Sequence, residues 1–294
     1  MNVLVLESGG GAGIATIEIL KMNNNDIKII AADCDKFAGG LYLAHEGVVL
    51  PHISNPLYTG ALIRLCETKN ISAIMPTFEW GFDLVRKLEL PFLTDLESAI
   101  LCKDKLQFAQ RARSAGLDVP LTVPLRDAHL TPPFFVKPRY GAGSRGIGIV
   151  RKKEDATYFL NSGINYVAQE LLHGQHYSVD VLVHQKKFIT AVPRANIRVR
   201  SGEPVTVRIE KNEIIMGCAK QVTERLGIKS TFNLEGFLDA GTFFINEINV
   251  RFGSGIIFPY LAGVNFPAYL LGFKTNIKFR AGVFTTISRG LELK

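Results

Sequence analysis

The sequence predicts an α/β protein that begins with a doubly wound parallel sheet. Three observations predict this fold class. Short apolar runs alternate with helical patterns up to residue 95, a lysine and a glycine-rich loop separate two apolar runs at 134–150, and strand patterns dominate from residue 166 onward. We therefore expect three units, at 1–95, 96–165 and 166–294.

The sequence of the first unit predicts four strands with helices between them. The predicted strands cover 3–6, 27–32, 47–50 and 71–75, and the predicted helices run from the glycine-rich turn 8–13 to Leu20 and over 61–68. Asp33 follows the second strand, where a dinucleotide-binding protein places an acid on a ribose. Gly9, Gly11 and Gly13 do not have the G-x-G-x-x-G spacing of such a protein. A dinucleotide site here stays open but is disfavoured.

The second unit contains a glycine-rich loop that matches G-x-G-x-x-G at Gly141, Gly143 and Gly146. A dinucleotide-binding loop opens a helix, but here the following residues alternate glycine with β-branched side chains and predict a strand. A hairpin with Lys137 at its base and Arg145 at its tip suits a flap over a polyphosphate, because glycine lets backbone N–H groups approach phosphate oxygens. An ordinary glycine-rich hairpin is the alternative.

The remaining elements complete an α/β chain whose last unit is rich in strands. Helices are predicted over 103–115, 156–162 and 213–226, and strands over 166–171, 177–184, 187–191, 206–209, 232–238 and 243–248.

A group of polar residues ends the last of these strands. Side chains alternate between the faces of a strand, so Glu247, Asn249 and Arg251 project together. A short turn at 239–241 predicts a hairpin that brings Glu235 beside Glu247. Two adjacent carboxylates repel unless a cation lies between them, and oxygen ligands suit Mg²⁺. The alternative is a strand that runs out to a solvated end.

Composition excludes several classes of protein. The net charge is +7, but the basic residues are spread along the chain and their short clusters lack interleaved aromatics. An anionic small-molecule substrate such as a nucleotide explains the excess as well as a nucleic acid does, so the charge alone decides nothing. The four cysteines are scattered, which disfavours a disulfide framework and a zinc site. No apolar run approaches the ~20 residues of a membrane helix, and the first residues lack a signal-peptide pattern. We expect a cytoplasmic protein.

The lysine and glycine hairpin, followed by an acid and then N-E-x-N-x-R, resembles the ATP-grasp superfamily. The most similar branch is that of the carbamoyl-phosphate synthase large subunit and of stand-alone carboxylate–amine ligases, and the resemblance covers nearly the whole chain. Residues 3–14 and 74–79 resemble the preATP-grasp domain of that branch, and 102–105 resemble its C-x-D-K helix start. The resemblance implies an ATP-grasp architecture, with a preATP-grasp domain followed by two α+β subdomains that clamp ATP.

The resemblance also implies roles for individual residues. The residues that would bind the phosphates of ATP are Lys105, Lys137 and the flap residues Gly141, Gly143, Ser144, Arg145 and Gly146. Adenine would be held at the hinge by Gln169, Glu170 and Leu172, mainly through the backbone. The Mg²⁺ (or Mn²⁺) ligands would be Glu235, Glu247 and Asn249, with Arg251 and Arg194 as the catalytic arginines. His176 stands where the family usually has an acid on the ribose, so it takes a ribose or structural role or, less favoured, that of a general base.

The resemblance implies an ATP-dependent ligase that joins a carboxylate to an amine (or a thiol) through an acyl phosphate. Its partners would be small molecules, with no nucleic acid and no membrane, and a homodimer through the N-terminal region is compatible with the sequence. The chain lacks the second ATP-grasp half of a full synthase, so we do not expect that enzyme. The alternatives are an NAD(P)-linked oxidoreductase that uses Asp33 and a non-catalytic nucleotide-binding regulatory protein. The sequence does not identify the carboxylate or the amine.

Overall fold

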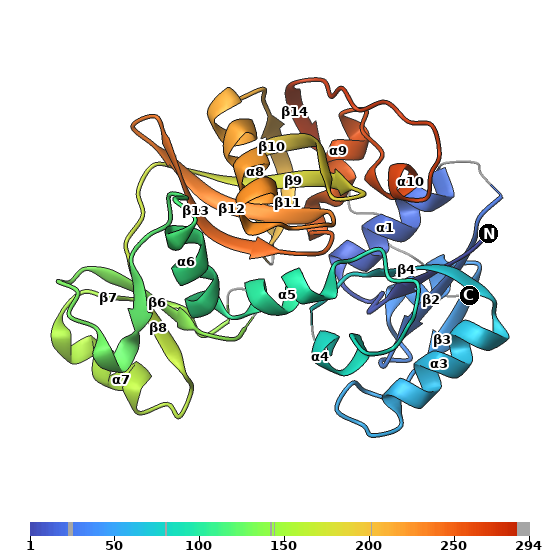
Figure 1. Cartoon of the computed structure of the whole chain (residues 1–294), viewed down its shortest axis with the longest axis horizontal. Helices are drawn as coiled ribbons and strands as arrows, with labels where there is room; N and C mark the ends of the chain where they lie inside the picture. Colours follow the sequence, from blue (N-terminus) through green and yellow to red (C-terminus); the bar gives the residue numbers. More distant parts are fainter. Residues whose placement is uncertain (23–25, 80, 142, 144, 201, 287–294) are drawn as a thin grey trace.

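The computed structural model describes residues 1–286, except 23–25, 80, 142, 144 and 201. Its strands form three sheets (Figure 1). The N-terminal sheet has the order β3-β2-β1-β4, the middle sheet β5-β8-β6-β7, and the C-terminal sheet β13-β12-β9-β10-β11-β14. Figure 1 shows the middle sheet at one end of the molecule, whereas the N-terminal and C-terminal sheets lie together at the other.

The N-terminal sheet is parallel, as predicted. Its strands are β1 (Asn2–Leu6), β2 (Lys28–Asp33), β3 (Glu46–Val49) and β4 (Ile71–Pro76), and its helices are α1 (Gly11–Met22), α2 (Gly39–Leu43), α3 (Tyr58–Thr68) and α4 (Phe82–Val85). The sequence pattern located these strands because fully buried parallel strands are continuous apolar runs. In this order β1 lies between β2 and β4: the chain moves outward from β1 through β2 to β3 and then crosses back to place β4 on the other side of β1.

Two helices connect the N-terminal sheet to the middle sheet. They are α5 (Leu96–Lys103) and α6 (Lys105–Ser114), where a single helix from residue 103 was predicted. The prediction was wrong at its first residues because Asp104 is extended and caps α6, its carboxylate accepting from the N–H groups of Leu106 and Gln107. This cap fixes Lys105 at the first position of α6.

The middle sheet contains the glycine-rich hairpin. Its strands are β5 (Thr122–Pro124), β6 (Phe134–Pro138), β7 (Gly148–Val150) and β8 (Tyr166–Glu170), and α7 (Ala156–Leu160) lies between β7 and β8. β6 and β7 are antiparallel, so a strand follows the loop, as predicted. β8 also belongs to this sheet, which therefore ends at Glu170. The three-unit division stays a prediction, and a boundary drawn on this sheet would fall after Glu170 instead of after residue 165.

The C-terminal sheet is antiparallel and is packed against one long helix. Its strands are β9 (Gln175–His184), β10 (Lys187–Arg200), β11 (Glu203–Ile209), β12 (Phe232–Asp239), β13 (Thr242–Asn249) and β14 (Gly282–Thr285), and the helix is α8 (Glu213–Leu226). β10 is longer than the predicted strand 187–191, because it pairs with β9 on one side and with β11 on the other. The helices α9 (Ile257–Leu261) and α10 (Phe266–Leu270) were not predicted.

Buried side chains of the N-terminal and C-terminal sheets share hydrophobic cores. One cluster joins Leu4 and Ile74 to Val179 and Ile245. The middle sheet has a separate core of six buried residues, which are Leu125, Phe134, Val136, Val150, Tyr166 and Ala168. The molecule therefore consists of a large block that carries a small attached sheet.

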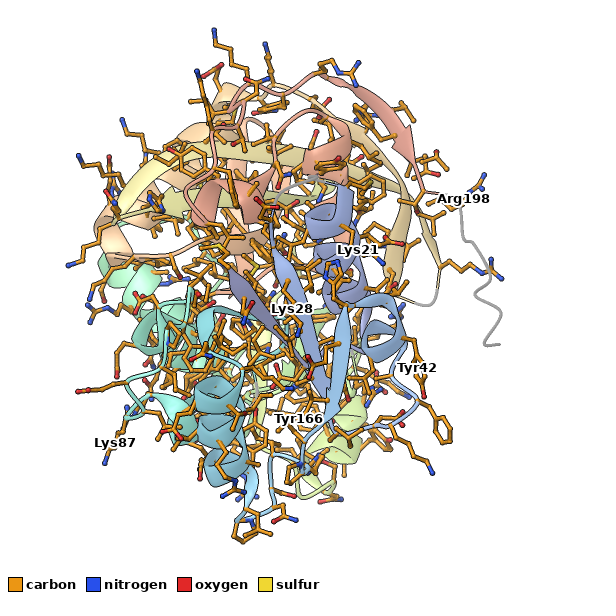
Figure 2. The ribbon with its side chains drawn as sticks, turned by 90° about the vertical axis from the view of Figure 1, so that its right-hand side faces the viewer. Lys21, Lys28, Tyr42, Lys87, Tyr166 and Arg198 are labelled. Atoms are coloured by element: carbon orange, nitrogen blue, oxygen red, sulfur yellow. The ribbon has the colours of Figure 1, made fainter. Side chains whose placement is uncertain are left out.

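Basic side chains project from different parts of the surface. Lys87 and Arg198 project on opposite sides of the view in Figure 2. No helix in the described residues is long and apolar enough to cross a membrane.

Candidate active site

Glu235 and Glu247 face each other across β12 and β13. The hairpin was predicted, and the two residues are Cα partners in it because the antiparallel register shifts between Glu235 and Gly236. Burial and the neighbouring charge of Glu247 raise the pKa of Glu235, although the nearby cations Arg194, Arg251 and Lys137 oppose this shift. Two carboxylates held this close favour a bound cation.

Two lysines reach these carboxylates from other elements. Lys137 on β6 is 3% exposed, and its Nζ donates to the backbone oxygen and to Oδ1 of Asn246, at 3.1 and 3.0 Å. Burial lowers the pKa of Lys137 to about 8. Lys105 Nζ donates to the carbonyl of Gly141 at 2.7 Å and lies 3.8 Å from Oε1 of Glu247. The hairpin, α6 and β13 therefore meet at one group of opposite charges.

Asp104, which was not among the predicted site residues, holds this junction together. Its carboxylate binds Nε and Nη2 of Arg139 at 2.8 and 2.7 Å and accepts from the Tyr140 hydroxyl at 2.6 Å. Burial acts to raise the pKa of Asp104, but these hydrogen bonds outweigh it and the pKa is lowered. The Asp in C-x-D-K was the available signal. Because Asp104 also caps α6, it couples the position of Lys105 to the start of the glycine loop.

The glycine loop keeps backbone conformations that suit glycine. Gly143 and Gly146 have φ of 67° and 72°, a region that other residues rarely adopt. Arg145 is exposed at the tip and Gly141 is half-buried at the base. Ser144, also predicted to bind phosphate, lies outside the described residues.

The predicted hinge connects the middle and C-terminal sheets. The Gln169 side chain is buried and donates to the Thr122 hydroxyl at 3.0 Å, and Glu170 accepts from the backbone N–H of Leu121 at 2.7 Å. Leu172 is half-buried beyond the end of β8. These side chains support the local structure, so an adenine contact through the backbone stays a prediction.

His176 and Arg194 lie on β9 and β10. The His176 Nε2 is 3.8 Å from Oε2 of Glu235, and its pKa is lowered by burial and by the charge of Arg194. Arg194 is 2% exposed, and its Nε donates to Asp180 at 2.7 Å. Asn233 donates to the other oxygen of Asp180 at 3.0 Å. These contacts give Arg194 a structural ion pair beside the carboxylates, and its catalytic role stays a prediction.

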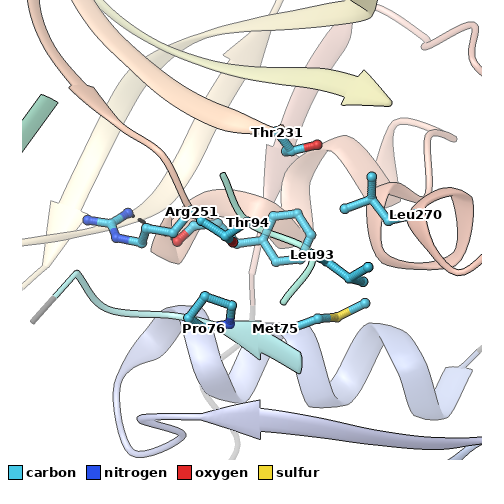
Figure 3. A pocket seen from close by; sticks show the side chains of 8 residues that line it. Met75, Pro76, Leu93, Thr94, Thr231, Arg251 and Leu270 are labelled. Atoms are coloured by element: carbon cyan, nitrogen blue, oxygen red, sulfur yellow. Dashed lines mark hydrogen bonds between the residues drawn. The ribbon is translucent and has the colours of Figure 1, made fainter. Parts of the chain in front are cut away.

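Arg251 and Asn249 complete the predicted set. Asn249 is buried at the end of β13. The Nη1 of Arg251 donates to the carbonyl of Phe252 at 3.0 Å, while its Nε has no hydrogen-bond partner. Arg251 lines a small pocket together with Pro76 and Thr94 (Figure 3). The pocket places Arg251 at the junction between the N-terminal and C-terminal sheets.

The donor set fits a cation held jointly by protein and phosphate oxygens. Within the described part of the chain, no group of three or more His, Cys, Asp or Glu side chains could hold a metal ion. The predicted ligands are two carboxylates and one amide. Such a set is incomplete by itself and matches Mg²⁺, which usually takes a few protein oxygens together with water and substrate phosphates.

Family comparisons cover most of the chain. The ATP-grasp domain family matches residues 102–255, which is just over half of the chain, and the PylC-like N-terminal domain family matches residues 4–96. A protein of Streptomyces coelicolor, provisionally assigned as a D-alanine–D-lactate ligase, is 26% identical over 77% of this chain and 71% of its own length.

Solved structures share the fold at lower identity. An L-amino acid ligase from Bacillus licheniformis superposes with a TM-score of 0.72 at 18% identity, covering 92% of this chain and 73% of its own. An N5-carboxyaminoimidazole synthetase from Staphylococcus aureus, complexed with ADP, superposes with a TM-score of 0.78 at 18% identity, covering 97% and 82%. None of these comparisons supports the oxidoreductase alternative.

Proposed function

Because the chain belongs to the ATP-grasp family, we propose that it is an ATP-dependent ligase that joins a carboxylate to an amine and releases ADP and phosphate. The observation that carries the proposal is the meeting of Lys105 and Lys137 with Glu235 and Glu247 beside a glycine hairpin. The lysines suit phosphate oxygens, and the carboxylates suit a phosphate-bound cation.

The nucleotide would lie between the middle and C-terminal sheets. Lys105, Lys137 and the flap, including Ser144 and Arg145, would bind the phosphates, and residues 169–172 would hold adenine. Mg²⁺ (or Mn²⁺) would be held by Glu235, Glu247 and Asn249. The chemistry that such a cation supplies is neutralisation of charge on the β- and γ-phosphate oxygens. We assign His176 to ribose or to support of Glu235, because its Nε2 lies 3.8 Å from Oε2 of Glu235.

Phosphoryl transfer would start the reaction. A carboxylate oxygen of the substrate forms a bond to the γ-phosphorus as the bond to ADP breaks, giving an acyl phosphate. Arg251, with Arg194 beside it, offsets the charge that develops. The amine nitrogen then attacks the acyl carbon, phosphate leaves, and the amine loses a proton. Closure of the flap excludes water, which would otherwise hydrolyse the acyl phosphate.

The test is ADP release across a panel of carboxylates, each with and without amine partners, together with a thermal-shift measurement of ATP·Mg²⁺ binding. We expect ATP·Mg²⁺ to raise the unfolding temperature and at least one carboxylate–amine pair to release ADP. Binding without turnover on any pair would favour the non-catalytic regulatory protein. Failure to bind ATP·Mg²⁺ would refute the ligase. Sedimentation would decide whether the chain forms a homodimer.

A further inference from the structure

The side chain of Lys137 connects two sheets of the molecule. Lys137 belongs to β6 of the middle sheet, whereas Asn246 lies on β13 at the edge of the C-terminal sheet. The Nζ of Lys137 donates to the backbone oxygen of Asn246 at 3.1 Å and to its Oδ1 at 3.0 Å. An ammonium group has three donors and no acceptor. Asn246 therefore accepts from two donors of Lys137, and the third donor is left for a ligand.

A β-bulge explains how one residue supplies both acceptors. The register of β12 and β13 shifts between Glu235 and Gly236, and the shift leaves Asn246 without a Cα partner on β12. The extra residue of a bulge is unpaired in the ladder, and bulges next to active sites re-aim side chains. In a regular strand, Asn246 and Glu247 would project from opposite faces. Here Asn246 binds Lys137 directly, and the charge of Glu247 acts on the same lysine.

The acceptor that holds Lys137 is neutral, so the lysine keeps its charge. Lys137 is buried, and a buried ammonium is costly unless hydrogen bonds compensate it. Among the described residues, Lys137 forms no ion pair with a carboxylate, whereas Lys105 lies 3.8 Å from Oε1 of Glu247. An amide fixes the position of an ammonium without neutralising it. The charge and the third donor of Lys137 are therefore available to an anion.

We propose that Asn246 is the positioning residue of Lys137 and directs its third donor to a phosphate of ATP. This inference rests on the proposed function and adds to its ATP site a residue that acts through the lysine. Asn246 precedes Glu247 on β13, so it holds Lys137 of the middle sheet in a fixed relation to a proposed cation ligand of the block. A phosphate that binds the cation then also meets the lysine.

The experiment measures the Kd of ATP·Mg²⁺ and the Kd of adenosine by calorimetry. Asn246→Leu keeps a branched side chain but removes its acceptor, so we expect the Kd of ATP·Mg²⁺ to rise about 10-fold. The Kd of adenosine, which carries no phosphate, should change by less than about twofold. Asn161→Leu, the same change at an exposed asparagine that follows α7, is the matched control and should leave both Kd values unchanged.

A double-mutant cycle tests whether Asn246 acts through Lys137. Lys137→Met removes the ammonium that Asn246 would position. In this background Asn246→Leu should change the Kd of ATP·Mg²⁺ by less than about twofold, because a residue that acts only through its partner has no effect once the partner is gone. An equal rise in Kd with and without the lysine would overturn the assignment.

The remaining outcomes separate this inference from the proposed function. A wild-type chain that does not bind ATP·Mg²⁺ would refute the ATP site and both proposals with it. If the wild type binds and a folded Asn246→Leu variant binds equally well, only the positioning role is overturned. Equal losses for ATP·Mg²⁺ and adenosine would overturn it as well, because they would reflect a general change of structure. If Asn246→Leu does not fold, Asn246→Ala removes the same acceptor with less bulk, and the same outcomes decide.

Discussion

The middle sheet and the block formed by the other two sheets differ in the size of the hydrophobic core that stabilises them. The middle sheet depends on a core of six buried residues, whereas the N-terminal and C-terminal sheets share much larger clusters. Proposed ligands of ATP·Mg²⁺ lie on both sides of this division, with the phosphate ligands Lys137 and the glycine loop on the small sheet and the cation ligands Glu235 and Glu247 on the block. A lightly packed element beside a rigid one is suited to open and close, because regions with few buried contacts open at low free energy.

The largest expected effect comes from the block side of the site. Glu247→Gln should lower kcat by about 10²- to 10³-fold, because it removes one of the two carboxylates that would hold the phosphate-bound cation. Thermal unfolding should be unchanged or slightly higher, since the substitution relieves repulsion with Glu235. Glu224→Gln on the exposed face of α8 is the control. Full activity of the Glu247 variant would show that the cation site is misplaced.

The second largest effect is expected from a substitution at the junction between the middle sheet and the block. Asp104→Asn removes the charge that binds Arg139 and weakens the cap of α6, so Lys105 loses its fixed position. We expect a loss of about 2 kcal/mol in the free energy of unfolding and a KM for ATP raised by about 10-fold. Denaturant unfolding and ADP-release kinetics measure the two effects. A KM equal to that of the wild type would contradict the role given to this cap.

A matched pair of core substitutions tests the division directly. Val136 in the middle sheet and Val179 in the block are both 0% exposed. Each change to alanine should cost about 1–2 kcal/mol. Hydrogen exchange should show faster exchange confined to residues 122–170 in Val136→Ala, whereas Val179→Ala should accelerate exchange in both sheets of the block. Identical exchange patterns in the two variants would mean that the molecule unfolds as a single unit.

The smallest effect concerns pH. The pKa of Lys137 is lowered to about 8, so the free chain loses this charge as the pH rises through 8. The Kd for ATP·Mg²⁺ should therefore rise about fourfold between pH 7 and 8.5. The free energy of unfolding should increase over the same rise in pH, although the affinity for ATP·Mg²⁺ decreases. Between pH 8 and the ordinary lysine pKa of 10.5, Lys137 binds more protons in the unfolded chain than in the folded one, so raising the pH favours the folded state. Lys137→Arg should flatten the binding profile, measured by calorimetry.

Sequence patterns predicted the elements whose side chains repeat with a clear period. The strands of the N-terminal sheet were continuous apolar runs, and the turn at 239–241 predicted the hairpin of β12 and β13. The register from this turn alone would place Glu235 opposite Asn246, and a shift between Glu235 and Gly236, which the sequence did not predict, pairs Glu235 with Glu247. The far half of β10 was missed because residues 197–200 are exposed and are held in the sheet by pairing with β11. Glu79 was recognised only as part of a motif, because the charges of Glu247 and Arg251, which act on its carboxyl, lie about 170 positions away in the sequence.

The shared core of the block has a consequence for how the chain is made. The N-terminal sheet is complete at Pro76, but the strands that cover its buried side chains begin at Gln175. During synthesis, about 100 residues must follow before that apolar surface can be covered, which at ribosomal speeds takes about 5–20 s. The nascent chain therefore exposes apolar surface of the N-terminal sheet throughout this interval. The strands of the middle sheet all lie within 122–170, so this sheet can fold as soon as it emerges from the ribosome.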